Sequence, residues 1–265
     1  MGDVFKRNNV AVRGKGQRLV VFAHGLGCDQ RVWEAVAARL DADYRLALFD
    51  YVGSGRSDRA AYDPARYASV ADYARDLTEV VDALGGPPPV LVGHSISAAV
   101  GVVASVARPA LFERMVLLAP SPRYLDDLPD YVGGFQPADI AAVLDLMDRN
   151  FLGWSTSFAG FVAKEPRVID VMTDFLSASD PRATRRFAEM TFNIDIRGLL
   201  PEVPVPSLIV QCRNDAVAPE SVGELMHRLM PRSTYELVDV VGHCPHLSDP
   251  RSIAGLVHRF IQEGP

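Results

Sequence analysis

Two patterns in the sequence predict an α/β fold built on a mostly parallel, doubly wound sheet. Several short runs are apolar at nearly every position, as in parallel strands that are covered by helices on both faces. Between them lie segments with apolar residues three and four positions apart, which predict helices packed on the sheet. The 265 residues are 48% hydrophobic and 23% charged, so the chain is long and apolar enough to bury such a core.

The predicted elements alternate along the chain. The runs predicted as strands are residues 19–23, 45–49, 90–92, 115–118, 208–210 and 235–241. The predicted helices of the same region are residues 32–40, 73–84, 222–229 and 253–261. Ser69 can cap the second of these helices, and Asp249 followed by Pro250 can open the last. This alternation is typical of parallel strands joined by helical crossovers.

One segment, from Tyr124 to about Leu200, interrupts the alternation. It has no convincing strand pattern, and four helices are predicted in it, at residues 140–151, 156–162, 168–177 and 181–191. Its aromatic residues are Tyr124, Tyr131, Phe135, Phe151, Trp154, Phe158, Phe161, Phe175, Phe187 and Phe192. They exceed what a small helical insertion needs for its own packing, so we expect some to face a cavity. The sequence thus predicts a helical lid over residues 123–200, on a core formed by residues 1–122 and 201–265.

The composition restricts the partners of this protein. It has 27 Lys and Arg against 33 Asp and Glu, a net charge of −6, and no basic cluster suited to nucleic acid or an anionic membrane. Its three cysteines fit a reducing compartment better than a disulfide framework. The first 16 residues lack the apolar stretch of a secretory signal, and no apolar run is long enough to span a bilayer. We therefore expect a soluble cytoplasmic protein that binds neither nucleic acid nor membrane.

Ser95 is the candidate nucleophile. It follows the predicted strand at 90–92 and precedes a run of small residues that opens a helix. A tight strand-to-helix turn strains the residue at its apex and requires small neighbours, here Gly93 and Ser97. Glycine is more usual at the second position, so Ser97 is tolerable but not ideal. In this setting the Ser95 hydroxyl would project above the sheet.

A serine hydroxyl needs a base, and a carboxylate usually orients that base. His243 and Asp215 each follow a late strand, and the chain order Ser95, Asp215, His243 is that of α/β-hydrolases. His246 stays an alternative base, although Gly242 favours His243 by allowing a close turn. His94 is the other alternative, but as the neighbour of Ser95 its side chain should point away from the Ser95 hydroxyl.

The oxyanion donors are predicted from the same geometry. The N–H of Ile96 lies at the start of a helix, where it can donate to an oxyanion. Gly25 and Gly27 flank Leu26 and allow the backbone to turn its N–H toward Ser95. We therefore expect Leu26 and Ile96 to form the oxyanion hole.

Three other motifs have plainer interpretations. The stretch Gly53-Ser54-Gly55 lacks the Lys-Ser/Thr pair of a phosphate-binding loop and is predicted to be a tight turn, in which Asp50 and Ser57 bond backbone groups. His243 and His246 lack the further ligands of a metal site, so no metal and no cofactor are expected. A catalytic role for Cys28 or Cys244 is an alternative, but the residue at the apex of the strand-to-helix turn is a serine, which argues against it.

Six strings spread along the chain are specific enough to indicate a family: Gly-Leu-Gly-Cys-Asp-Gln at 25–30, Phe-Asp-Tyr-Val-Gly-Ser-Gly-Arg-Ser-Asp at 49–58, Val-Gly-His-Ser-Ile-Ser-Ala at 92–98, Ser-Pro-Arg-Tyr-Leu at 121–125, Gly-Gly-Phe at 133–135 and Gly-His-Cys-Pro-His-Leu-Ser at 242–248. With these strings the chain resembles, over nearly its whole length, the RsbQ group of bacterial stress regulators and the plant karrikin and strigolactone receptors. The resemblance implies an α/β-hydrolase core, a four-helix, V-shaped lid over an apolar pocket, and the triad Ser95, Asp215 and His243.

The resemblance also implies which side chains line the pocket. The family's pocket aromatics carry over to Tyr124, Phe135, Trp154, Phe158 and Phe192, and we expect Leu26 and Val217 to line the same pocket. Leu26 stands where the plant receptors usually have phenylalanine, which should widen the pocket beside the nucleophile.

Two functions follow as expectations. The first is a serine hydrolase that acts on a small, mostly apolar ester or lactone. The second is a ligand-sensing signalling protein of a sigma-factor stress pathway, with slow or incidental hydrolysis. It would work through a partner phosphatase that carries a PAS domain, as the resemblance to RsbQ implies.

Overall fold

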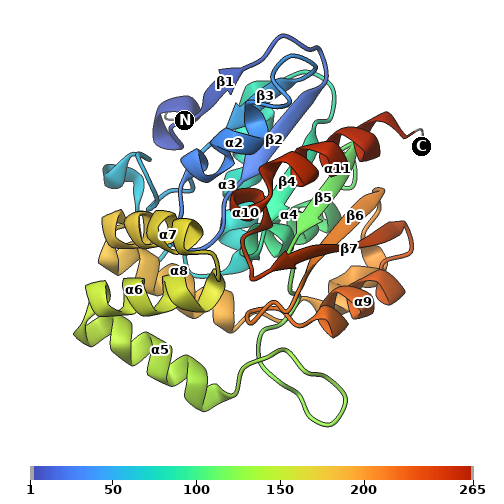
Figure 1. Ribbon diagram of the computed structural model, residues 1–265. Helices are drawn as coiled ribbons and strands as arrows, with labels where there is room; N and C mark the ends of the chain where they lie inside the picture. Colours follow the sequence, from blue (N-terminus) through green and yellow to red (C-terminus); the bar gives the residue numbers. More distant parts are fainter. Residues whose placement is uncertain (1–2, 264–265) are drawn as a thin grey trace.

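The computed structural model describes residues 3–263 and is organised around one seven-stranded sheet (Figure 1). The strands are β1 (Ala11–Arg13), β2 (Leu19–Ala23), β3 (Arg45–Leu48), β4 (Val90–His94), β5 (Arg114–Leu118), β6 (Ser207–Arg213) and β7 (Ser233–Val241). Their order in the sheet is β1-β3-β2-β4-β5-β6-β7, and only the β1–β3 pairing is antiparallel. The predicted fold class, a mostly parallel sheet with helices around it, is confirmed.

Burial explains which strands the sequence pattern detects. Strands β2, β4 and β5 are buried at every position, as their continuous apolar runs predict. The two edge strands differ. β1 is short and mostly exposed, so it carries no apolar run and was not predicted. β7 alternates between half-buried and exposed residues, so the interpretation of residues 235–241 as a continuously buried run was wrong.

The strand order places a crevice beside Ser95. From β2 the chain moves to β3 on one side, whereas β4 pairs with β2 on the other side. The loops that follow β2 and β4 therefore leave in opposite directions, and side chains at these carboxyl ends face a common crevice. The loop with Leu26 follows β2, and Ser95 follows β4.

The helices around the sheet form two groups. They are α1 (Val4–Arg7), α2 (Glu34–Ala37), α3 (Val70–Leu84), α4 (Ile96–Ala107), α9 (Glu220–Leu229), α10 (Pro245–Ser248) and α11 (Pro250–Gln262). Helices α2 and α11 contact each other in front of the sheet as drawn in Figure 1, and α3 and α4 contact each other behind it. Short 3₁₀ helices at Gln30–Trp33, Arg59–Ala61 and Arg197–Glu202 complete the connections.

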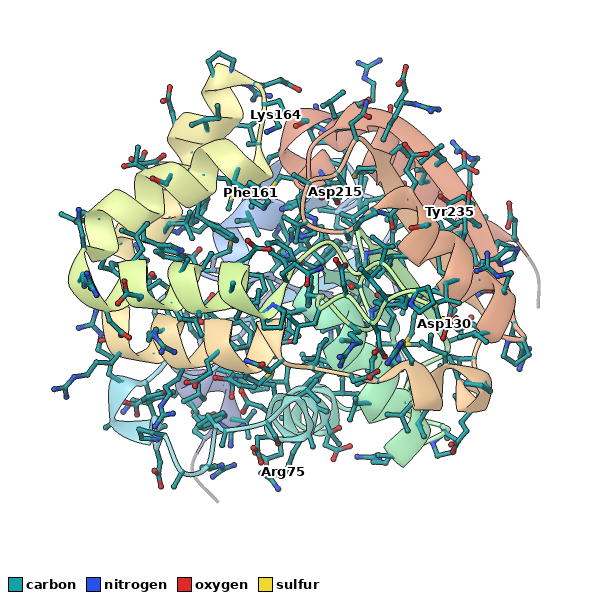
Figure 2. All side chains as sticks on the ribbon, turned by 90° about the horizontal axis from the view of Figure 1, so that it is seen from below. Arg75, Asp130, Phe161, Lys164, Asp215 and Tyr235 are labelled. Atoms are coloured by element: carbon teal, nitrogen blue, oxygen red, sulfur yellow. The ribbon has the colours of Figure 1, made fainter. Side chains whose placement is uncertain are left out.

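Four helices occupy the segment between β5 and β6: α5 (Pro137–Arg149), α6 (Phe151–Val162), α7 (Pro166–Ala178) and α8 (Pro181–Phe192). Their starts have clear local causes, because proline occupies the first turn of α5, α7 and α8, and Asn150 caps α6. They lie below the sheet in Figure 1, and Figure 2 views the molecule from that side, with Asp215 near its centre. The segment is called the helical insertion below. Among residues 3–263, no helix is both long and apolar enough to cross a bilayer.

Candidate active site

The backbone at Ser95 has the conformation of a strained elbow. Its φ is 57° and its ψ is −123°, a backbone conformation that residues other than glycine rarely adopt. A hydrogen bond from the Ser95 N–H to the Leu118 carbonyl, 2.8 Å long, holds the turn against β5. Position 93 must be glycine here, because a Cβ atom would lie 2.8 Å from the Ser97 carbonyl oxygen. The strand, turn and helix therefore hold the Ser95 side chain at the carboxyl edge of the sheet.

Ser97 has a bonding role at the position where the elbow more often has glycine. Its hydroxyl donates to the His24 carbonyl and lies 3.0 Å from the Tyr51 hydroxyl, in a fully buried position. The hydroxymethyl group thus joins the elbow to the end of β2 and to the loop after β3. A buried hydroxyl that is satisfied in this way stabilises the turn.

Ser95, His243 and Asp215 form a continuous chain of hydrogen bonds. The distance from His243 Nε2 to Ser95 Oγ is 2.7 Å, and that from His243 Nδ1 to Asp215 Oδ2 is 2.7 Å. The other carboxylate oxygen, Oδ1, accepts hydrogen bonds from the N–H groups of Val217 and Ala218, at 2.8 and 3.2 Å. These donors stabilise the ionised carboxylate, which holds the imidazole with Nδ1 protonated and Nε2 free to accept the serine proton.

The loop of His243 is attached to the helical insertion. The His243 N–H donates to the carbonyl of Val162, the last residue of α6, at 2.8 Å. Gly242 pairs with Ala163 and has a φ of 106°, a left-handed conformation that glycine adopts without strain. The position of the imidazole therefore depends on α6 as well as on the sheet.

The two alternative bases are buried behind His243. His94 Nε2 lies 2.8 Å from the His243 carbonyl, so as a neutral imidazole it donates to the backbone of that residue. The ring of His246 packs in a tilted arrangement between two aromatic rings, with its centroid 4.3 Å from that of His94 and 4.7 Å from that of Trp33. Burial lowers the pKa of His246 to about 3 and also lowers the pKa of His94. Neither of them bonds to Ser95, so the geometry selects His243 from the three candidates.

The loop after β2 lies against Ser95. A Cβ atom at Gly25 would be 2.8 Å from His94 Nδ1 and 3.5 Å from Ser95 Cβ. His24 stiffens this loop, because its Nδ1 donates to the Gly25 carbonyl and its Nε2 accepts the Tyr51 N–H. Within residues 3–263, neither the Leu26 N–H nor the Ile96 N–H has a protein acceptor. Both therefore stay available to a ligand oxygen.

A small cavity adjoins Ser95 and His243. Its free volume is about 20 Å³, close to what one water molecule occupies. Of the predicted pocket residues, those on its wall are Leu26, Tyr124, Phe158, Phe192 and Val217. The cavity is narrow because its lining side chains, several of which come from the helical insertion, close tightly around the serine.

Two of the predicted pocket residues lie one layer further out. Trp154 stacks behind Phe158 on α6, with ring centroids 5.4 Å apart, and Phe135 packs behind Phe192 at 5.4 Å. Both are buried, but neither is on the wall of the cavity. In this structure Phe158 and Phe192 stand between these two side chains and Ser95, so their role in lining a ligand pocket stays a prediction.

Residues that the sequence did not single out for the pocket complete its wall: Cys28, His94, Val162, Met172, Thr191 and Cys244. Two of these are cysteines, and burial raises the pKa of Cys28 to about 12 and raises that of Cys244 as well. Such thiols stay protonated at neutral pH, which argues against a cysteine nucleophile. For Val162, Met172 and Thr191, the periodicity of the predicted helices could indicate at most that these residues face inward. It could not indicate that they reach the cavity beside Ser95.

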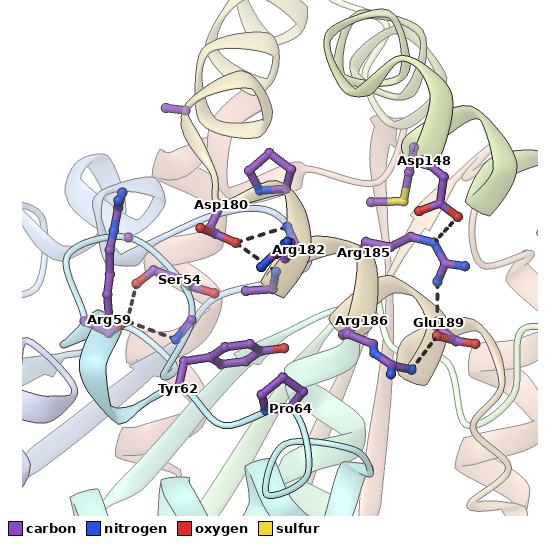
Figure 3. Close-up of a pocket in the computed structure, with 17 residues that line it drawn as sticks. Ser54, Arg59, Tyr62, Pro64, Asp148, Asp180, Arg182, Arg185, Arg186 and Glu189 are labelled. Carbon is purple, nitrogen blue, oxygen red and sulfur yellow. Dashed lines mark hydrogen bonds and ion pairs between the residues drawn. The ribbon is translucent and has the colours of Figure 1, made fainter.

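A larger surface groove lies away from this cavity. It has a volume of about 830 Å³ and separates the loop at residues 53–64 from α5 and α8 (Figure 3). On its wall Arg185 pairs with Asp148 and Glu189, and Arg186 pairs with Glu189, whereas Arg59 and Arg182 form no ion pair within residues 3–263. The Gly53–Gly55 stretch on its wall is a tight turn, with Asp50 and Ser57 bonded to backbone groups, as predicted. None of its lining residues lines the cavity at Ser95.

Comparisons with known proteins agree with this geometry. A sequence profile described as the alpha/beta hydrolase family matches residues 20–256. A probable esterase of Oryza sativa subsp. japonica is 38% identical over 99% of this chain and 98% of its own length. A strigolactone esterase of Arabidopsis thaliana is 35% identical over 98% of both chains. Among solved structures, a hydrolase from Oleispira antarctica superposes with a TM-score of 0.96 at 36% identity, covering 99% of this chain and 97% of its own.

Proposed function

This chain belongs to the alpha/beta hydrolase family, and from that premise we propose that it is a serine hydrolase of a small, mostly apolar ester or lactone. One observation carries the proposal: the hydrogen bonds of 2.7 Å that join Ser95 to His243 and His243 to Asp215. In α/β-hydrolases this order of residues, with the serine at a strand-to-helix elbow, serves acyl transfer.

The proposed reaction has two halves. Ser95 Oγ attacks the carbonyl carbon while His243 Nε2 takes the serine proton, and the N–H groups of Leu26 and Ile96 bind the resulting oxyanion. The intermediate collapses when the C–O bond of the leaving alcohol breaks and His243 returns the proton to that oxygen. Water, deprotonated by His243, then attacks the acyl carbon, the bond from that carbon to Ser95 Oγ breaks, and His243 returns the proton to Oγ as the acid is released. Asp215 stabilises the imidazolium in both halves.

The cavity supports the proposed substrate class. Apart from the polar groups around Ser95 and one threonine, its wall is made of apolar side chains. Among the described residues, no Asp, Glu, Lys or Arg side chain lines the cavity, so its wall offers no such charge to recognise an ionic substrate. Curated relatives named as esterases, one of them a strigolactone esterase, are 35% and 38% identical over nearly the full chain. The chemistry of this wall suits a small uncharged ester or lactone, and the helical insertion has to move before such a molecule can enter.

The direct test is the Ser95→Ala variant on a panel of small aryl esters. We expect kcat/KM to fall by about 10³-fold or more, since the triad acts as a unit. Ser105→Ala is the matched control, because Ser105 is a buried serine of α4 that bonds only the Val102 carbonyl. In parallel, mass spectrometry after exposure to candidate lactones should reveal an adduct on Ser95 or His243. Wild-type turnover by Ser95→Ala would refute the proposal.

A second function is favoured by a different observation. Relatives from Petunia hybrida that are named karrikin-insensitive receptors are also similar, one of them at 36% identity over 98% of this chain. The helical insertion closes the cavity and bonds the His243 loop, so ligand entry requires movement that a partner could detect. In this reading the protein is a slow hydrolase that senses its ligand and signals through a partner, a PAS-domain phosphatase if the resemblance to RsbQ extends to function. Slow turnover with a ligand-dependent rise in Tm would favour the sensor, and fast turnover with no partner the metabolic enzyme.

A further inference from the structure

Thr191 is a polar residue in the apolar part of the cavity. It lies in the last turn of α8, its exposed fraction is 2%, and it lines the cavity beside Ser95. Within residues 3–263 its hydroxyl has no hydrogen-bond partner. Because a buried hydroxyl without a partner costs free energy, nearly all such groups in folded proteins are satisfied.

Among the helical threonines of residues 3–263, the lack of a hydrogen-bond partner for the hydroxyl is specific to Thr191. Thr78, Thr156 and Thr173 each donate to the carbonyl four residues earlier, at 2.8, 3.3 and 2.8 Å. Thr184, also on α8, donates to the Ser179 hydroxyl at 2.9 Å. Thr191 makes no bond of this kind to Phe187, the residue four positions before it. Its hydroxyl is therefore left to the cavity instead of to its own helix.

The surroundings of Thr191 offer little else to bond. The wall residues contributed by α6 and α7 are Phe158, Val162 and Met172, all apolar. The polar groups of Ser95, Tyr124 and His243 are already bonded to one another or to Asp215. His94 also lines the cavity, and its Nδ1 has no partner within residues 3–263, but this atom lies against Gly25. The partner that remains for the Thr191 hydroxyl is a water molecule, for which the cavity has room, or an oxygen of a ligand that displaces this water.

We propose that Thr191 is a ligand-recognition residue, which donates a hydrogen bond to an oxygen of the acyl part other than the scissile carbonyl. This inference rests on the proposed hydrolase function and narrows its substrate class. The preferred substrate is an ester or lactone whose acyl part carries an ether, hydroxyl or keto oxygen, rather than a pure hydrocarbon chain. A site that hydrogen-bonds such a group discriminates against analogues that lack it, because its own buried hydroxyl would stay unpaired.

The test compares pairs of aryl esters that share one leaving group and differ by CH₂ against O in the acyl chain. One pair is butanoyl and methoxyacetyl, and the other is pentanoyl and 3-methoxypropanoyl, so that the oxygen is sampled at two positions. The readout is the ratio of kcat/KM for the oxygenated ester to that for the hydrocarbon ester. Intrinsic reactivity cancels when this ratio is compared between variant and wild type, and so does any loss of folded enzyme.

In the Thr191→Val variant we expect this ratio to fall about fivefold to tenfold for at least one pair, the worth of one neutral hydrogen bond. Thr191→Ser should restore most of the ratio, because it keeps the hydroxyl. Thr173→Val is the matched control, since Thr173 bonds its own helix at Ile169 and does not line the cavity, and its ratio should equal that of the wild type.

The outcomes separate the two proposals. If neither pair changes its ratio in Thr191→Val, the recognition role is overturned, while the hydrolase function stands as long as activity still requires Ser95. A ratio that falls equally in Thr173→Val would also overturn it, because the effect would then not belong to the cavity. If Ser95→Ala keeps full activity, the hydrolase function fails first.

Discussion

Tyr124, like His243, has a polar atom within hydrogen-bond distance of the candidate nucleophile. Its hydroxyl lies 3.3 Å from Ser95 Oγ, and the residue is fully buried. Burial raises the pKa of this phenol, so it is protonated at neutral pH. Since the single serine hydrogen goes to His243, Tyr124 donates to Ser95 Oγ. The resemblance identified Tyr124 as a pocket aromatic, but its bond to the nucleophile depends on how the chain folds.

Replacing Tyr124 with phenylalanine tests the importance of this donor. We expect kcat to fall about threefold to tenfold in Tyr124→Phe, because one neutral hydrogen bond near the reacting oxygens is lost. Steady-state kinetics on an aryl ester would measure the change. Tyr131→Phe is the control, because Tyr131 lies in the same segment and bonds the Arg123 carbonyl instead. If kcat of Tyr124→Phe stays within twofold of the wild type, the phenol takes no part in the reaction.

At the level of the secondary-structure elements, the turn from β4 to α4 depends on close backbone contact. The carbonyl of Ser97 approaches position 93 so closely that no rotamer change could relieve an added methyl group. By contrast, Gly160 lies in α6, and a Cβ atom there would have no neighbour within 4 Å. Gly93 is therefore required by the close contact at the elbow, whereas Gly160 meets no such contact and only lowers the stability of its helix.

The pair Gly93→Ala and Gly160→Ala measures this difference. We expect Gly93→Ala to lower the free energy of unfolding by about 1–3 kcal/mol through overpacking. Gly160→Ala should raise it by about 1 kcal/mol through helix propensity. Urea unfolding followed by circular dichroism gives both values. Equal stabilities for Gly93→Ala and the wild type would show that the elbow can relax, contrary to the geometry described here.

Across the molecule, several buried histidines make stability sensitive to pH. His24, His94 and His246 are nearly or fully buried, and desolvation is the main reason why the pKa of each is lowered in the folded protein. The unfolded chain would bind protons at these side chains below about pH 6.5, whereas the folded chain does not. Their contribution to stability is therefore present above pH 6.5 and is lost as the pH falls.

His246 allows this linkage to be isolated. Between pH 7.5 and 5.0 its neutral burial should lower the free energy of unfolding by about 2 kcal/mol. In His246→Phe, which keeps a flat ring between Trp33 and His94, the total loss over this range should be smaller by that amount. Trp33→Phe disturbs the same cluster without removing a titrating group, so its pH dependence should match the wild type. An unchanged pH dependence in His246→Phe would mean that His246 binds its proton equally well in the folded and the unfolded chain, contrary to the lowered pKa.

Local patterns predicted the elements because their causes are local. Apolar runs indicated the buried strands, and Gly93 and the small residues after Ser95 indicated the elbow. The placement of Asp215 and His243 after late strands followed from the parallel topology, which brings carboxyl ends together. Strand β1 escaped prediction because it is short and exposed, and the alternation of β7 reflects its place at the edge of the sheet.

Contacts between distant segments settled the rest. The closeness of Phe158 and Phe192 to Ser95, with Trp154 and Phe135 behind them, depends on how the helical insertion packs over the sheet. The free hydroxyl of Thr191 and the bond from the His243 N–H to Val162 likewise join or separate residues by packing alone. Hydrophobic periodicity tells which face of a helix is buried. It does not tell which neighbour that face meets, because the neighbour is selected by volume and hydrogen bonding in the assembled core.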